Sequence, residues 1–210
     1  TLGVAKVLAN ASSVHAISTY LQSETEWDFM AVYHDAIDHF CHLAMKYHPP
    51  KRDHIDQEDF DNFKLVVEAA YRFHDMMLER TIDLMDDDTT LMLISDHGFH
   101  SDHQRPLFIP KEPSGPATEH SPYGIFVMAG PGVKRGGIKI SGASILDITP
   151  TILSFYNMPI GKDMDGKVLS SIYEIPQKDK YIDSWENIPG DFGGHTKESI
   201  EDPWSAQEAL

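Results

Sequence analysis

One short stretch, Thr90 to His100, constrains both the fold and the chemistry of this chain more than any other. It begins as an apolar, β-prone run and stops abruptly at Asp96, His97 and Gly98. Open α/β sheets bind ligands at the carboxyl ends of their strands, where such polar residues gather. Asp96 and His97 offer two metal-compatible ligands in one turn, although Asp-His-Gly is also compatible with a simple turn.

The composition bounds the class of protein. The chain has 210 residues, of which 41% are hydrophobic and 24% charged, enough for one domain with a real core or most of a larger one. The net charge of −16 argues against a nucleic-acid polymer as partner, and bound cations would be needed to hold an anionic substrate. No apolar run approaches the ~20 residues that span a bilayer. The single cysteine, Cys41, excludes an internal disulfide and a thiolate-rich zinc site.

The spacing of apolar residues predicts helices that alternate with strands. Helices are predicted over about 4–22, 35–47, 59–84 and 144–156, and buried strands over 28–33, 90–95 and 124–130. The irregular stretch 98–122 is long for a compact domain, and such loops are frequently functional. This alternation predicts an α/β fold, with a mostly parallel sheet flanked by helices on both faces.

The helix predicted from about residue 35 carries a second set of possible ligands. Asp38 and His42 are four residues apart and share one face, so both can reach one ion. Asp35 and His39 have the same spacing on a different face, and spacing does not choose between the two pairs. A solvated helix start, where aspartate favours the helix dipole, is the alternative interpretation.

His120 is the third candidate, just before the strand predicted at 124–130. A lone loop histidine is usually only a polar surface residue. Here three stretches coincide, because each lies at the end of a predicted strand and each offers carboxylate or imidazole groups. Their agreement favours a metal site over three unrelated polar turns.

Four spaced motifs in order resemble the C-terminal half of the type I phosphodiesterase/nucleotide pyrophosphatase family, within the alkaline phosphatase superfamily. They are Ala31-Val32-Tyr33 followed by Asp38 and His42, then Ser95-Asp96-His97-Gly98-Phe99, then His120 with Gly124 to Gly132, then Leu146 to Leu153. The resemblance covers roughly residues 25–170. It implies an alkaline-phosphatase-like fold, here as a partial domain.

The resemblance also implies a site for two divalent metal ions, with zinc favoured. By match to the family's motifs, Asp38 and His42 would join His120 on one metal, while Asp96 and His97 would bind the other. On this basis Asp38, and not Asp35, is the expected ligand.

The activity that the resemblance implies is hydrolysis of small phosphate esters, as by a phosphodiesterase or nucleotide pyrophosphatase. In such enzymes a Thr or Ser oxygen attacks phosphorus, and two metals clamp the attacking and leaving oxygens. The family's nucleophile and a further metal-binding Asp lie in its N-terminal half, and neither motif is found here. We therefore expect the nucleophile upstream and this chain alone to be inactive. The alternatives are a phosphomutase or sulfatase of the same superfamily, or a catalytically dead metal-binding or scaffold protein.

The expected organisation is the C-terminal part of a catalytic domain over 1–170, with an irregular extension over 171–210 packed on it. The chain begins at Thr1 without Met and ends in what reads as the start of a helix. We therefore expect it to be part of a longer protein whose N-terminal half completes the site. The sequence supports no prediction of localisation.

Overall fold

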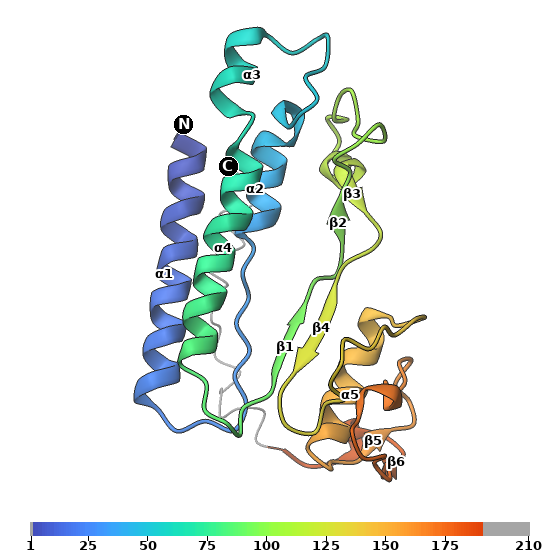
Figure 1. The fold of residues 1–210 in the computed structure, drawn as a ribbon. Helices are drawn as coiled ribbons and strands as arrows, with labels where there is room; N and C mark the ends of the chain where they lie inside the picture. The colour runs from blue at the N-terminus through green and yellow to red at the C-terminus, as the bar shows by residue number, and fades with distance from the viewer. Residues whose placement is uncertain (1, 191–210) are drawn as a thin grey trace. The chain divides into compact units, whose positions relative to one another are not determined.

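The computed structural model describes residues 2–190, which fall into two compact units, the first ending at Val133 and the second beginning at Lys134. Figure 1 shows the α-helices of the first unit before its strands in chain order. Its helical elements are α1 (Leu2–Glu24), α2 (Ala36–Ala44), η1 (Met45–Tyr47), α3 (Gln57–Phe63), α4 (Val66–Asp83) and η2 (Gly115–Glu119). Its strands are β1 (Leu91–Ile94), β2 (Gly98–Phe99), β3 (His120–Ser121) and β4 (Phe126–Ala129).

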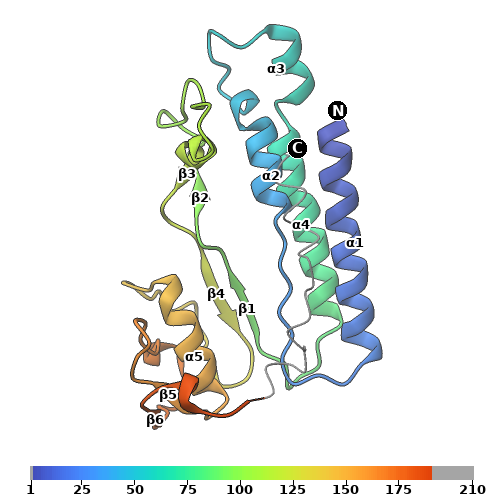
Figure 2. The ribbon, with the colours of Figure 1, turned by 180° about the vertical axis from the view of Figure 1, so that it is seen from behind.

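The core of the first unit lies where α2 packs between α1 and α4, which run side by side in both views (Figures 1 and 2). Ala36 of α2 and Ala70 of α4 are buried there, and such small side chains allow helices to approach closely. Phe40 fills the same interface at 4% exposure. Because α2 packs against both α1 and α4, its orientation is fixed, and so is the position of the polar groups on its remaining face.

The sheets differ from the mostly parallel sheet that the sequence predicts, and that prediction is wrong for the described residues. β1 pairs antiparallel with β4, with Ile94 opposite Phe126, and β2 pairs antiparallel with β3. The buried strand predicted over 28–33 is also wrong, since no strand is assigned there and Tyr33 is 83% exposed. An apolar run becomes a strand only where a neighbouring strand accepts its backbone hydrogen bonds, and none of the strand pairings in the described residues includes this run.

Most predicted helices are confirmed. α1 matches the prediction over 4–22, and α2 with η1 matches that over 35–47. α1 is less amphipathic than expected, since Ile17 and Tyr20 are more than 60% exposed. The single helix predicted over 59–84 is instead α3 and α4, separated by a turn at Lys64 and Leu65. No glycine or proline marks that turn, so the periodicity of the sequence runs through it without a signal.

The second unit is built around α5 (Ile148–Phe155), within the helix predicted over 144–156. Its other elements are η3 (Ile145–Asp147), β5 (Ile160–Gly161), η4 (Ser170–Ile172), β6 (Tyr181–Ile182) and η5 (Trp185–Asn187). β5 and β6 pair in parallel, the one parallel pairing among the described residues.

Asp147 organises the start of α5. Its side chain accepts a hydrogen bond from the Ser144 backbone N–H, while the Ser144 hydroxyl caps η3 in return. The other carboxylate oxygen accepts from the Lys167 N–H at 2.8 Å, which ties the chain after the turn to the helix. Gly166 is required beside it, because a Cβ there would lie 1.9 Å from the Leu146 carbonyl oxygen.

The predicted extension over 171–210 is described only as far as residue 190, and its remaining residues lie outside the described part. The boundary predicted at residue 170 stays a prediction. Within residues 2–190, no helix combines the length and the apolar character needed to cross a membrane.

Candidate metal centre

α2 presents Asp38 and His42 one helical turn apart. Phe40 and Ala44 are buried on another side of the same helix, so core packing fixes its rotation about its axis. The His42 Nε2 lies 3.5 Å from the Asp38 Oδ1, and both side chains keep about a quarter to a third of their surface exposed. The two groups therefore share one accessible side of α2.

The β2–β3 pairing carries the other imidazoles to this side. Phe99 stands opposite His120 in the antiparallel register, which places His97, one residue before β2, next to His120. The two imidazole rings stack with their centroids 3.8 Å apart and 13° between their planes. The Phe99 ring contacts both His42 and His120 edge-to-face at 4.9 Å. The β2–β3 pairing thus brings together His97 and His120, which are 23 positions apart in the sequence.

The loop that carries His120 is anchored to the end of α2 through Arg105. This side chain is 4% exposed and donates hydrogen bonds to the carbonyl oxygens of Met45, His48 and Pro50. Multiple charge-assisted hydrogen bonds of this kind hold a buried guanidinium in one geometry.

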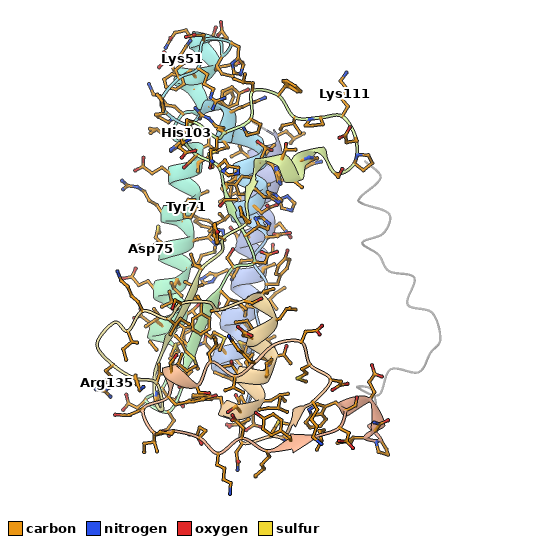
Figure 3. The ribbon with its side chains drawn as sticks, turned by 90° about the vertical axis from the view of Figure 1, so that its right-hand side faces the viewer. Lys51, Tyr71, Asp75, His103, Lys111 and Arg135 are labelled. Atoms are coloured by element: carbon orange, nitrogen blue, oxygen red, sulfur yellow. The ribbon has the colours of Figure 1, made fainter. Side chains whose placement is uncertain are left out.

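A second contact fixes the same loop from outside. Arg52 donates to the Asp102 carbonyl oxygen at 3.3 Å, so the loop bearing Lys51 and the loop bearing His103 lie side by side (Figure 3). The long irregular stretch 98–122 is therefore tied to the helix that supplies the other candidate ligands.

Three donor atoms converge at the centre of this arrangement. The ligand atoms of Asp38, His42 and His120 all lie within 4.8 Å of one another. The His120 Nε2 is 3.0 Å from the His42 Nε2 and 3.4 Å from the Asp38 Oδ1. A tetrahedral zinc ion with bonds of 2.0–2.1 Å separates its ligand atoms by about 3.3 Å. The triangle formed by the three donors has the dimensions that such an ion requires.

The Asp38 Oδ1 provides an independent test of whether a cation fits. This oxygen is buried and lacks a hydrogen-bond partner, although three ring nitrogens face it at 3.4–3.7 Å. Leaving a buried carboxylate oxygen unpaired is costly, typically by more than 1–3 kcal/mol for a charged group. A divalent cation among these atoms would satisfy it, so the donor set fits a metal ion.

The electrostatic environment favours the neutral form of His120, which is the form that binds a metal ion. Burial lowers the pKa of His120, and the neighbouring His97 lowers it further, so the ring stays neutral as metal binding requires. Burial raises the pKa of Cys41 to about 12, with Asp38 and Glu119 adding to the effect. Cys41 is not one of the three residues whose ligand atoms converge here.

Glu119 is a functional candidate to which the sequence assigned no role. Its Oε2 lies 2.8 Å from the His42 Nδ1, on the side of the ring away from the donor triangle, and the residue is 4% exposed. A carboxylate directly before a candidate ligand could have drawn attention to it. Its partner, however, is 77 positions away, so only the fold identifies the contact.

Asp96 and His97 are arranged less compactly. The His97 Nε2 lies 3.7 Å from the Asp38 Oδ1 and 3.9 Å from the Asp96 Oδ1, between the two carboxylates. Asp96 is 71% exposed. In the described part of the chain, these two residues do not form a second group of three ligands. Their assignment to a second metal stays a prediction.

The alternative pair on α2 lies elsewhere. The His39 Nε2 is 3.2 Å from the Asp35 Oδ2, and the His39 side chain is 52% exposed. The geometry therefore associates Asp38 and His42, not Asp35 and His39, with His120.

Fold and donor set together define a mixed α/β protein with a candidate divalent-metal centre. The sequence matches the family "Type I phosphodiesterase / nucleotide pyrophosphatase" over residues 4–109, half of the chain. The chain belongs to this family. The match contains Asp38, His42, Asp96 and His97, while His120 lies beyond it. No curated protein and no solved structure matches the chain. Family membership supports phosphoester hydrolysis as the class of reaction.

Proposed function

We propose that this chain contributes a two-metal site to a hydrolase of phosphoric esters, of the phosphodiesterase or nucleotide pyrophosphatase type. The observation that carries the proposal is the convergence of the Asp38 Oδ1 with the Nε2 atoms of His42 and His120. Residues 82 positions apart in the chain meet in a triangle of metal-site dimensions, within a protein of a phosphoester-hydrolase family.

The first metal would be held by Asp38, His42 and His120. Three protein ligands leave a tetrahedral ion one open position, which is the pattern of a catalytic rather than a structural zinc site. Such an ion, when bound, supplies positive charge that stabilises the negative charge on phosphate oxygens. The net charge of −16 makes this contribution necessary, because without cations the protein would repel an anionic ester.

The second metal would be held by Asp96 and His97 together with groups from outside the described residues. We expect the nucleophile to come from an upstream N-terminal half. Ser95 is a poor candidate for that role, since its hydroxyl donates a hydrogen bond to the His97 carbonyl oxygen at 2.7 Å. The substrate class that follows is a small phosphate ester.

Metal binding by the 210-residue chain tests the site directly. The metal-free protein is titrated with Zn²⁺ by calorimetry, in parallel with His120→Ala and with His39→Ala as a matched control. His39 also faces a carboxylate across one helical turn of α2, but on the exposed side. We expect the parent and the control to bind zinc equally and His120→Ala to bind at least about 100-fold more weakly. Equal binding by all three proteins would refute the ligand set.

Hydrolysis of bis-p-nitrophenyl phosphate then separates the enzyme from its alternatives. The assay uses this chain and a longer product that includes residues encoded before Thr1, both loaded with zinc. We expect the longer product to turn over the diester and the 210-residue chain to be inactive. Zinc binding without turnover in the longer product would favour a metal-binding or scaffold protein.

A further inference from the structure

We propose that Glu119 is a positioning residue that holds His42 in the tautomer and orientation needed to present Nε2 to a metal. The inference rests on the proposed metal site at Asp38, His42 and His120. It concerns a residue outside that ligand set, and it predicts the protonation state of one ring nitrogen before any metal is bound.

The contact between the two side chains is short and sheltered. The Glu119 Oε2 lies 2.8 Å from the His42 Nδ1, and the Glu119 side chain is 5% exposed against 24% for His42. Hydrogen bonds to an ionised carboxylate are shorter and stronger than neutral ones, more so where water is excluded. An ionised carboxylate can only accept, so with Glu119 ionised the His42 Nδ1 is the donor.

This hydrogen bond decides which ring nitrogen remains available. A neutral imidazole carries one proton, so an Nδ1–H leaves a lone pair on Nε2. That Nε2 points to the donor triangle, 3.0 Å from the His120 Nε2 and 3.5 Å from the Asp38 Oδ1. The opposite tautomer would direct a proton into the triangle and could not bind a cation there. Metal-ligating histidines commonly have such a carboxylate on the other nitrogen.

The position of Glu119 in the fold couples two ligands. It is the last residue of η2 and directly precedes His120. Two adjacent residues therefore provide one ligand, His120, and the hydrogen-bond partner of another ligand, His42. The Glu119 carbonyl oxygen accepts the His100 N–H at 2.9 Å, which fixes the backbone at this point. Orienting His42 therefore does not depend on a freely moving side chain.

The first arm of the test observes the tautomer in the metal-free protein. Long-range ¹H–¹⁵N correlation of the imidazole nitrogens is recorded for the parent, Glu119→Ala, Glu119→Gln and the control Glu112→Gln, an exposed residue of the same loop. We expect His42 to carry its proton on Nδ1 in the parent, in the control and in Glu119→Gln, whose amide oxygen still accepts. Glu119→Ala should lose this preference. An Nε2–H tautomer in the parent would overturn the proposal, whatever the variants do.

The second arm measures zinc affinity of the same four proteins by competition with a chromophoric chelator. We expect Glu119→Ala to lose about 10–100-fold, Glu119→Gln to lose less, and Glu112→Gln to match the parent. An affinity of Glu119→Ala within threefold of the parent overturns the proposal, as does weaker binding with an unchanged tautomer. Circular dichroism checks folding, and Glu119→Gln together with the parent decides the outcome if Glu119→Ala is unfolded.

The two arms also distinguish this inference from the proposed function. A parent that takes up no zinc refutes the metal site but leaves the tautomer measurement intact. The role of Glu119 in orienting His42 is then judged on the imidazole nitrogens alone.

Discussion

Two groups of three histidines lie in the first unit, and they differ in what their ring nitrogens face. His42, His97 and His120 direct their Nε2 atoms at one carboxylate oxygen, at 3.4–3.7 Å. His15 of α1, His34 in the segment just before α2, and His74 of α4 form the second group, which we call the helix histidines because two of the three lie on helices. Each of them has a buried ring nitrogen without a hydrogen-bond partner.

The helix histidines interact as packing groups. The rings of His34 and His74 meet edge-to-face with centroids 5.6 Å apart, and Phe73 contacts His74 in the same manner. Among the described residues they do not form a group of ligand atoms within metal-binding reach. The sequence has twelve histidines, and their number alone does not separate ligands from packing groups. The difference lies in the convergence of lone pairs on a carboxylate.

The largest expected effect comes from removing the shared carboxylate. Asp38→Asn should lower zinc affinity by at least about 100-fold, because a neutral amide replaces the charged ligand. In the metal-free protein the same change should leave the free energy of unfolding within about 1 kcal/mol of the parent value or raise it, because the Oδ1 that it replaces is buried without a hydrogen-bond partner. Calorimetric titration and urea unfolding measure the two quantities. A large loss of metal-free stability would mean that Asp38 serves the fold instead.

The helix histidines should make the stability of the protein depend on pH, and they are not expected to bind metal. Burial, and then the proximity of His34, lowers the pKa of His74 to about 4 from an unfolded value near 6.5. The neutral ring therefore stabilises the folded protein above about pH 6.5, and this stability is lost as the pH falls toward 4.

His74→Phe isolates this contribution to the pH dependence. The variant should make the slope of unfolding free energy against pH shallower between 6.5 and 4, by at most about 1.4 kcal/mol per pH unit. Arg80 and Asp35 are the charged groups that act on this cluster, and both are retained. Urea unfolding at matched pH values measures the slope, and parallel curves for parent and variant would contradict the assignment. Zinc affinity at pH 7.5 should be unchanged.

The smallest effect is expected at Asp35, which directly precedes α2. Asp35 raises the pKa of His34 and of His74, while its carboxylate pairs with the exposed His39. Asp35→Asn should therefore lower the pKa of His74 slightly and leave zinc affinity within about threefold, since exposed ion pairs contribute little. NMR titration of the histidine ring protons measures the first quantity. A loss of zinc binding comparable to that of Asp38→Asn would place Asp35 in the metal site.

Much of the local structure could be predicted from the sequence. The apolar run that ends at Ser95 is β1, and the run before Gly130 is β4. Parallel pairing was the wrong expectation because strand direction is not encoded in apolar periodicity. It depends on which backbone is adjacent, and β4 lies antiparallel to β1 with the loop between them folded back. The break between α3 and α4 at Lys64 could not be predicted either, since no glycine or proline marks it.

The candidate ligands illustrate the same division. The i, i+4 spacing could bring Asp38 and His42 together, but it fitted Asp35 and His39 equally well. Only the packing of α2 against α1 and α4 turns the first pair toward His120. For His97 the sequence predicted a metal ligand but not its neighbours. Its stacking on His120 beside Asp38 was not foreseen.

What the sequence determined by itself is the chemistry available at each strand or helix end, because residue type and short-range spacing are local properties. The tertiary structure alone decided which of those groups face one another. The β2–β3 register sets His120 beside His97, the Arg105 anchor ties their loop to α2, and the buried Glu119 then meets a histidine 77 positions away. Contacts at such separations depend on how the whole unit packs, and no local pattern encodes them.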